Sequence, residues 1–539
     1  MPGNASTRAA LAVASGLLLA LSFPKFDLGF AAWIAFIPLL YAIEGQTSRR
    51  LFAYAWIQGF ACYVASIYWI VITLHNFAGV PLVLAVLPML LLAAVLALYT
   101  GIAFWAAEFI TARLGLPIVL TLPVVWTAVE WIRTYFPIGF PWNLLGYAAY
   151  QNLKLIQFAE FTGVYGISAL IIFFNAVVYV VLFRRDEPRV QAIGLGVLST
   201  LLVSAWVFGT IRINDLGKAT PVGSLKIAMV QGDIPQSIKW DPNFLSSSFN
   251  IYEDQTERAA KMGAGLIVWP EAAAAFFFQP EDRYPAVFAK DEEYRAKLLA
   301  LAAQTHDAIL FGAPALGVED NRVGFYNRAY LVNGEGKVAG WYDKIRLVPF
   351  GEYVPLRSLF GGLVNRVVKG FGDMFPGHVQ TIFDFKGARL GVLICYESIF
   401  PDLARGAVKR GADILLNITN DAWYGESSAP YQLLAMAAMR SVETKTPMVR
   451  VANTGISAVI LPDGQITDRT PLFKRGTEIE TVSWRPVTTV YVLVGDIFAI
   501  ACLVLTVAGL AAALFYRRPR QLQPEETEAL FHTNGTAVR

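Results

Sequence analysis

Histidine, cysteine and charge are scarce in this chain of 539 residues, and each scarcity excludes a class of protein. None of the four histidines is spaced with another histidine or a cysteine as metal ligands are. Three cysteines are too few for the disulfide framework of a small secreted domain. Charged residues make up 16% of the chain, against about 25% in ordinary soluble domains. The formal net charge of +3 is too small to indicate a nucleic-acid partner.

Hydrophobic residues make up 55% of the chain, which excludes a disordered protein. Several apolar runs reach the roughly 20 residues that cross a hydrocarbon core, so we expect a membrane protein. Seven runs precede the charged middle of the chain, at 8–23, 29–43, 52–74, 80–109, 116–132, 164–183 and 190–209. An eighth run, Ile497–Tyr516, ends at an arginine cluster. We interpret the first run as an uncleaved span, because no signal-peptidase site of small residues precedes Phe23-Pro24.

Basic residues gather on one side of these eight predicted spans. If the N-terminus is inside, the short inner loops carry Arg8, Arg49, Arg50, Arg113, Arg184, Arg185, Arg189 and the cluster at Arg517. The short outer loops carry only Lys25, Arg133 and Lys154. The positive-inside rule then places both termini in the cytoplasm and the domain after the seventh span outside, in the periplasm of a bacterium.

The predicted organisation has four parts. Residues 1–222 form a membrane domain with seven spans, 223–484 a soluble domain, 485–520 the last span and 521–539 a polar cytoplasmic tail. The aromatic-rich connection 133–163 fits either an aromatic belt at the outer interface or one wall of a lipid-facing entrance. Because Ile497–Tyr516 spans without it, we expect Asp496 at the membrane interface.

Strand and helix patterns interleave in the soluble part, which predicts an α/β domain with mixed sheets. The expected strands are 225–231, 265–269, 308–312, 326–332, 337–342, 390–395, 414–419 and 449–453. The expected helices are 244–262, 288–305, 399–410 and 428–445. Turn sequences separate these elements, among them Asn333-Gly334-Glu335-Gly336 and Asp463-Gly464.

Three reactive side chains follow strand ends: Glu271, Lys344 and Cys395. A cysteine thiolate is a strong nucleophile, a nearby lysine stabilises it, and a carboxylate accepts its proton. A fixed lysine also stabilises the oxyanion of a tetrahedral intermediate. We expect burial to raise the pKa of Glu271 and suit it to proton transfer near neutrality. Taken singly, Cys395 fits an inert core thiol, Glu271 a surface acid and Lys344 a solvated side chain.

The flanks of these residues resemble the nitrilase superfamily. The stretches are Trp269-Pro270-Glu271, Asp343-Lys344 through Glu352-Tyr353-Val354-Pro355, and Cys395-Tyr396-Glu397. Supporting stretches occur at 230–235, 417–425 and 450–455, so the resemblance covers roughly 225–484. It implies a four-layer αββα sandwich with Glu271 as general base, Lys344 as oxyanion stabiliser and Cys395 as nucleophile. It also implies that Glu352 orients the lysine.

With its eight predicted spans, the chain resembles the apolipoprotein N-acyltransferases of bacterial inner membranes over nearly its whole length. The stretches Gln236-Ser-Ile-Lys-Trp240-Asp-Pro242 and Phe140-Pro-Trp142-Asn143 are similar to that family as well. The resemblance implies transfer of the sn-1 acyl chain of a phospholipid, chiefly phosphatidylethanolamine, to the α-amino group of a diacylglyceryl-cysteine lipoprotein. A thioester on Cys395 is the implied intermediate. We expect no metal or other cofactor, and a monomer in the lipid bilayer.

Four further features are candidates for supporting roles. Trp240 either lines a lipid cavity or packs, and Tyr396 either shapes the pocket or fills core space. Glu397 is placed to hold the nucleophile loop through backbone amides. Residues 355–378 place apolar and basic residues at mostly helical spacing among glycines. We interpret 355–378 as a mobile lid at the lipid interface, with a packed amphipathic helix as the alternative.

Three other functions share parts of this pattern. A membrane-tethered amidase would use the same triad with water as acceptor, although eight spans exceed what an anchor needs. A cysteine–histidine hydrolase would need His306 or His378, and neither has a matching local signature. A transporter with an external sensor domain would need ionisable residues in its spans, and apart from Glu108 and Glu130 near the boundaries few occur.

Overall fold

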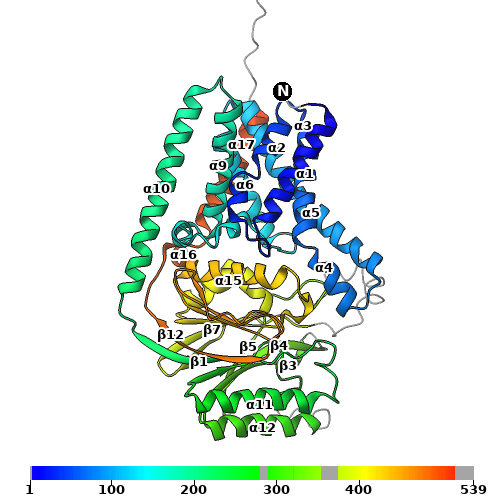
Figure 1. Ribbon diagram of the computed structural model, residues 1–539, viewed down its shortest axis with the longest axis vertical. Coiled ribbons are helices and arrows are strands. Elements are labelled where there is room, and N and C mark those ends of the chain that lie inside the picture. Colours follow the sequence, from blue (N-terminus) through cyan, green and yellow to red (C-terminus); the bar gives the residue numbers. More distant parts are fainter. Residues whose placement is uncertain (1–2, 280–288, 320, 354–373, 516–539) are drawn as a thin grey trace, which may run out of the picture.

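The structure, a computed structural model, describes residues 3–279, 289–319, 321–353 and 374–515. The predicted lid at 355–378 falls largely outside these residues, and the predicted tail at 521–539 falls wholly outside them. A bundle of apolar helices forms one half of the molecule and a layered α/β domain the other (Figure 1). The chain passes from the bundle to the α/β domain through the long helix at Pro188–Lys218 and returns to the bundle for the last helix, Ile497–Phe515.

The helical bundle contains the first ten α-helices and the last one. They are α1 (Ala5–Leu21), α2 (Ile37–Ile43), α3 (Ser48–Ser66), α4 (Trp69–Ile72), α5 (Leu82–Leu114), α6 (Ile118–Tyr135), α7 (Leu153–Ile156), α8 (Ala159–Thr162), α9 (Val164–Phe183), α10 (Pro188–Lys218) and α17 (Ile497–Phe515). Shorter helical turns connect them: η1 (Gly29–Trp33), η2 (Thr73–Phe77) and η3 (Leu145–Ala149).

Four helices in the described residues, α5, α9, α10 and α17, are long and apolar enough to cross a membrane. A fifth span results if α3 and the segment Trp69–Phe77, bent by 46° at a break, count as one. The other three predicted runs are less regular than their composition indicated. The first is 17 residues long in α1, the second is divided between η1 and α2, and α6 contains the buried polar side chains of Glu130 and Arg133.

The α/β domain contains two six-stranded sheets. The first has the order β12-β1-β2-β3-β4-β5 and the second β11-β10-β9-β8-β7-β6. The first sheet consists of β1 (Gly223–Gln231), β2 (Leu266–Val268), β3 (Ala308–Glu319), β4 (Arg322–Val332), β5 (Val338–Asp343) and β12 (Gly476–Trp484). The second consists of β6 (Ile382–Phe385), β7 (Ala388–Ile394), β8 (Ile414–Thr419), β9 (Met448–Ala452), β10 (Ala458–Ile460) and β11 (Ile466–Thr467).

Alternating residues of the first sheet face two different cores, as the two-residue period of a strand requires. On β1, Ala228 and Val230 pack against α11 (Leu245–Lys261) and α12 (Ala289–Thr305). Their neighbours Ile227 and Met229 join the core shared with the second sheet. Helices α14 (Pro401–Lys409) and α15 (Ala429–Thr444) cover the far side of that sheet. The layers therefore follow the order α, β, β, α (Figure 1).

All eight strands expected from the sequence are present, and β6, β10, β11 and β12 are additional. The longest of these, β12, was missed because its side chains are mostly polar and partly exposed, which is typical of an edge strand. It pairs antiparallel with β1 along its whole length, with Gly223 opposite Trp484. This pairing brings the two ends of the α/β domain together below the membrane helices.

Helix α15 lies between the second sheet and the membrane helices (Figure 1). Every side chain from Leu433 to Thr444 along it is buried, although several are polar. Near its start, the Gln432 side chain accepts a hydrogen bond from Trp142 and donates to the Pro24 and Ser66 carbonyls, all in the membrane domain. Near its end, Arg440 and Glu443 form a buried ion pair of 2.9 Å. We refer to Gln432, Arg440 and Glu443 as the docking cluster.

Candidate active site

Glu271 follows β2 at the edge of the first sheet, where its carboxylate has donors on both oxygens. Asn327 of β4 donates to Oε1 over 2.7 Å, and the Asn420 main-chain N–H donates to Oε2 over 2.8 Å. The backbone of β3 approaches so closely that a Cβ on Gly312 would lie 2.8 Å from the Glu271 Cα. Glycine at 312 therefore allows the glutamate to sit against the neighbouring strand.

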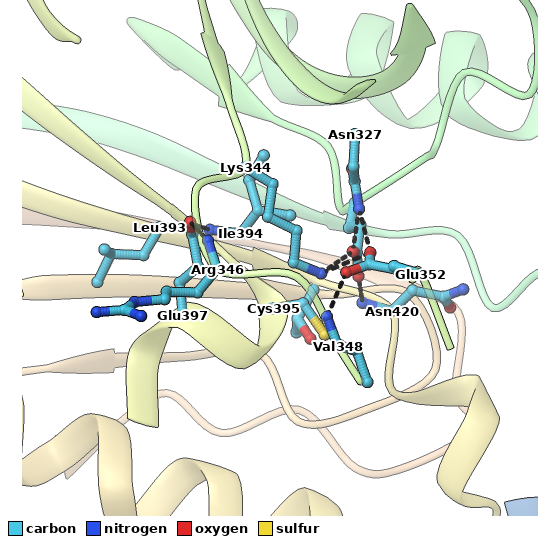
Figure 2. A network of polar contacts seen from close by, with 12 residues as sticks. Asn327, Lys344, Arg346, Val348, Glu352, Leu393, Ile394, Cys395, Glu397 and Asn420 are labelled. Atoms are coloured by element: carbon cyan, nitrogen blue, oxygen red, sulfur yellow. Dashed lines mark hydrogen bonds and ion pairs between the residues drawn. The ribbon is translucent and has the colours of Figure 1, made fainter. Parts of the chain in front are cut away.

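Lys344 follows β5, and its ammonium lies between two carboxylates. Its Nζ is 3.3 Å from Oε1 of Glu271 and 2.8 Å from Oε1 of Glu352. Asn327 also bridges both carboxylates, since it donates to Glu352 over 3.1 Å. The second Glu352 oxygen accepts the Val348 main-chain N–H over 2.8 Å. Figure 2 shows the Lys344 ammonium directed at the Glu352 carboxylate, with Cys395 beside them.

Cys395 begins a short 3-10 helix, η4 (Cys395–Ile399), directly after β7. Its φ of 53° lies in the left-handed region, which a non-glycine residue adopts only when its surroundings impose it. Two side chains hold the turn: Asn417 of β8 donates to the Leu393 carbonyl over 3.0 Å, and Ser398 donates to the Cys395 carbonyl over 3.1 Å. The turn thus lifts the thiol out of the strand toward Lys344 and Glu271.

Glu397 connects the nucleophile turn to the lysine loop. Its Oε2 accepts the Ile394 N–H over 2.7 Å, and its Oε1 accepts the N–H groups of Ile345 and Arg346 over 2.6 and 3.1 Å. The Tyr342 hydroxyl lies 2.9 Å from both oxygens. One buried carboxylate therefore sets the spacing between Lys344 and Cys395 through their adjacent backbones (Figure 2).

The pKa of Glu271 is lowered, which corrects the expectation of a raised value. Burial alone would raise it, but the Lys344 ammonium, the Asn327 hydrogen bond, the charge of Lys239 and the Cys395 thiol together outweigh burial. The resting carboxyl group is therefore ionised at neutral pH. Burial of Glu271 could be expected from the sequence, but only the folded chain brings these donors to its carboxylate.

The two partners of Glu271 are protonated at rest. Burial, followed by the Glu271 charge, raises the pKa of the Cys395 thiol to about 12 despite Lys344 nearby. Burial lowers the pKa of Lys344, but the charges of Glu271, Glu352 and Cys395 outweigh it and hold the value well above its usual range. The resting site is thus a neutral thiol beside an ionised carboxylate and a charged lysine. This arrangement allows the carboxylate to take the thiol proton as sulfur attacks.

Several residues of this site were missed in the sequence. Asn327 lies inside a strand, where no local pattern singles it out. Asn420 and Lys239 do occur in stretches that carry the family resemblance, 417–425 and 236–242. Buried Lys239 donates to the main-chain oxygen of Glu271 over 3.0 Å. A signal for both residues was present, but nothing in the sequence showed that they meet Glu271.

The two remaining candidates, Trp240 and Tyr396, are sequence neighbours of residues at the site. Half-buried Trp240 directly follows Lys239, at the end of the turn after β1. Tyr396 is buried, packs edge-on against Phe400, and its hydroxyl donates to the Gly139 carbonyl of the membrane domain over 3.3 Å. The nucleophile turn therefore touches a loop of the helical bundle.

The α/β domain has two histidines, His306 and His378. His378 is largely exposed, and its Nε2 lies 3.6 Å from Oε1 of Glu319. Neither His378 nor His306 is among the groups whose charges shift the pKa of Cys395. Within the described ranges, no group of three or more His, Cys, Asp or Glu side chains is placed to hold a metal ion.

Comparisons with known proteins agree with this geometry. Residues 15–177 match the model of the apolipoprotein N-acyltransferase N-terminal domain, and 226–489 match that of carbon-nitrogen hydrolases. An apolipoprotein N-acyltransferase of Geobacter metallireducens is 39% identical over 516 residues, which covers 94% of this chain and 95% of that protein. The chain belongs to the apolipoprotein N-acyltransferase family. The resemblance noted in the sequence is thereby confirmed.

A second apolipoprotein N-acyltransferase, from Azotobacter vinelandii, is 35% identical over 480 residues and is covered to 88%, as is this chain. Among solved structures, a mutant of the Nesterenkonia AN1 amidase from the nitrilase superfamily matches with a TM-score of 0.37 and 24% identity. That match covers 49% of this chain and 92% of the amidase. In this N-acyltransferase the carbon-nitrogen hydrolase match coincides with the α/β domain, which contains Glu271, Lys344 and Cys395.

Proposed function

We propose that this inner-membrane acyltransferase moves the sn-1 acyl chain of a membrane phospholipid to the α-amino group of an apolipoprotein's N-terminal diacylglyceryl-cysteine. Membership of the family supports lipoprotein N-acylation. The observation that carries the finer proposal is that the Glu271–Lys344 pair lies beside Cys395. The turn that begins at Cys395 also contains Tyr396, whose hydroxyl contacts the membrane domain. The site thus combines acyl-transfer chemistry with a position next to the bilayer.

In the first half-reaction, Glu271 accepts the Cys395 thiol proton while sulfur attacks the ester carbonyl carbon. The carbonyl oxygen becomes an oxyanion, which the Lys344 ammonium stabilises. The intermediate then collapses, the ester C–O bond breaks, and protonated Glu271 returns the proton to the departing glycerol oxygen. A lysophospholipid leaves, and Cys395 holds the acyl chain as a thioester.

In the second half-reaction, the neutral α-amino group of the lipoprotein attacks the thioester carbonyl. Glu271 takes a proton from the attacking nitrogen, and the new amide forms as the C–S bond breaks. The same proton then passes to the departing sulfur, which restores the resting thiol. A covalent intermediate shared by two substrates predicts ping-pong kinetics. Phosphatidylethanolamine is the proposed donor, following the family resemblance.

Fatty chains keep both substrates in the bilayer, because each buried CH2 group is worth about 0.8 kcal/mol. We therefore propose the arrangement of eight spans, with the catalytic domain at 223–484 in the periplasm and both termini in the cytoplasm. The excess of arginine in the inner loops and the β1–β12 pairing at the domain ends support these boundaries. Reporter fusions after Arg113, Lys218 and Phe515 test the orientation. Only the fusion after Lys218 should report the periplasm.

Intact-mass measurement of the purified protein with phosphatidylethanolamine tests the chemistry. We expect an acyl adduct on the wild type that hydroxylamine removes, and none on Cys395→Ser. Addition of a diacylglyceryl lipopeptide should discharge the adduct and acylate the peptide amine. Release of free fatty acid at the same rate without lipopeptide would instead identify a water-dependent hydrolase. Absence of any adduct on the wild type would reject the thioester.

A further inference from the structure

A second lysine ammonium lies beside Glu271, and the mechanism above does not use it. Lys239 is 3% exposed, and its Nζ donates to the main-chain oxygen of Glu271 over 3.0 Å. Among the described residues, this is its single side-chain hydrogen bond, and it forms no ion pair. Lys344 is equally buried but has two carboxylates within 3.3 Å. The two lysines thus approach the same glutamate with different partners.

Lys239 is held in place by the loop that carries it, residues 232–240. Asn453 fixes the start of this loop, because its side chain accepts the Ile234 N–H over 3.0 Å and donates to the Ile234 carbonyl over 2.8 Å. Asn420 fixes the middle, since it donates to Gln236 over 2.8 Å while its own N–H binds Glu271. The loop is therefore attached to the same residues that hold the general base.

Burying the Lys239 ammonium costs free energy, because a buried charge is stabilised mainly by an opposite charge in contact with it and Lys239 forms no ion pair in the described part of the chain. Burial lowers the pKa of Lys239 to about 8, although the charges of Glu271 and Cys395 act in the opposite direction. A lysine that contributed only to packing would be better replaced by an apolar side chain of its length. An apolar residue could supply neither the hydrogen bond to the Glu271 main chain nor the positive field on Glu271 and Cys395.

We propose that Lys239 is a positioning residue for Glu271: it holds the Glu271 main chain and adds a second positive charge that keeps the carboxylate ionised beside the thiol. This inference rests on the proposed function, in which ionised Glu271 accepts the thiol proton. The charged or titratable groups that influence Glu271 are Lys344, Lys239, Cys395, Tyr424 and, through Lys344, Glu352.

The sign of the pH effect follows from the lowered pKa of Glu271. Thioester formation requires the carboxylate and is lost as the pH falls through that pKa. Removal of the Lys239 charge raises the pKa, so the acidic limb of the rate profile moves to higher pH. An opposite charge within about 4–6 Å typically shifts a carboxyl pKa by about one unit or more. Lys239→Arg retains the charge and should leave the acidic limb in place.

The test measures single-turnover thioester formation with phosphatidylethanolamine vesicles across the acidic and neutral range. We expect Lys239→Met and Lys239→Gln to shift the acidic limb upward by about one pH unit. Displacement of the base should also lower their maximal rate by about tenfold to a hundredfold. Lys239→Arg should keep the wild-type limb. The matched control is Lys226→Met, which removes an exposed lysine that also donates to one carbonyl, that of Met262.

The outcomes separate this inference from the proposed function. An acidic limb unchanged in the methionine and glutamine variants overturns the role of Lys239. If the maximal rate falls equally in Lys239→Arg and Lys239→Met and the acidic limb does not move, Lys239 has a structural role only. That result also overturns the proposal. If Lys239→Met does not fold, Lys239→Gln keeps a hydrogen-bond donor at this position and still tests the effect of removing the charge. Absence of a thioester on the wild type rejects the proposed function itself, whatever the variants do.

Discussion

Two buried charged regions of this protein use the same chemical groups for different ends. In the active site, the Glu271 carboxylate has donors on both oxygens, and its pKa is lowered. In the docking cluster, Glu443 accepts Arg440 and the Val164 N–H on one oxygen. Its other oxygen has no hydrogen-bond partner in the described part of the chain. Burial, only partly opposed by Arg440, raises the pKa of Glu443 to about 7.

Burial alone therefore does not decide the charge of a carboxyl group. Glu397 has four uncharged donors, yet burial raises its pKa to about 7. The pKa of Glu271 is lowered because two lysine ammoniums act on its carboxylate in addition to uncharged donors. The active site lies where loops from both sheets converge and supply several N–H groups and two ammoniums. The docking cluster lies on one helix facing the membrane domain, where the Arg440 guanidinium also binds the Ile399 carbonyl and stacks on Tyr147. In the proposed function the first region supplies the general base, whereas Arg440 of the second binds the nucleophile turn at Ile399.

Lys344→Met should have the largest effect, because it removes the charge from the active site alone. Loss of an oxyanion donor typically costs about 10²–10³-fold in rate, and loss of a member of a catalytic unit costs more. We expect thioester formation to fall at least about 10³-fold. Single-turnover mass analysis measures it, with exposed Lys409→Met as the matched control. A rate within tenfold of the wild type would mean that Lys344 does not stabilise the oxyanion.

Arg440→Met should act on stability before it acts on chemistry. It leaves Glu443 buried without its ion pair and removes the bond to the Ile399 carbonyl. Breaking a buried pair from one side costs about 3 kcal/mol or more. Denaturant unfolding in detergent measures the loss, and Arg258→Met, from an exposed pair with Asp254, should change little. Equal stability of the two variants would show that the docking cluster does not hold the domains together.

Gln432→Met should have a smaller effect in the same region. It leaves the Trp142 indole N–H and the carbonyls of Pro24 and Ser66 without their partner. An unsatisfied buried polar group costs about 1–3 kcal/mol, so we expect a loss of about 2 kcal/mol. The thioester rate per folded molecule should stay unchanged. A slower rate at full stability would instead connect Gln432 to the chemistry; exposed Gln465→Met is the control.

Tyr342→Phe should have the smallest effect. It removes the hydroxyl that donates to Glu397 but leaves the main-chain donors Ile345 and Ile394 in place. Loss of one hydrogen bond typically costs about 1 kcal/mol, and the thioester rate should fall less than tenfold. Unfolding and single-turnover assays on the same preparation measure both. A larger fall in rate than in Lys344→Met would reverse the ranking of these two residues.

The flanks of the reactive residues made much of the site predictable. Glu271, Lys344 and Cys395 follow strand ends in stretches that resemble one superfamily, and the structure brings their side chains together. Glu352 was also named, from the family resemblance, and Glu397 was named because it lies two residues past Cys395. Asn327 could not be found, because an asparagine in the middle of a strand carries no local signal. The four strands missed were edge or short strands with weak patterns.

The docking cluster was beyond sequence reasoning for a different reason. Gln432, Arg440 and Glu443 occur in a helix whose composition is that of an ordinary half-exposed helix. They are buried only because the membrane domain covers it. The aromatic residues Trp142 and Tyr147, expected at a lipid interface or entrance, are buried against the same helix. Such contacts join segments some 290 positions apart, as between Trp142 and Gln432.

The order of residues along the chain was enough to predict an apolar bundle, an α/β domain and the three groups that we propose transfer an acyl chain. These are properties of composition, period and local pattern, which a linear sequence carries. The charge states of Glu271 and Lys239 were decided only when the chain folded. A pKa depends on burial and on donors a few ångströms away, and the fold draws those donors from strands and loops far apart in sequence.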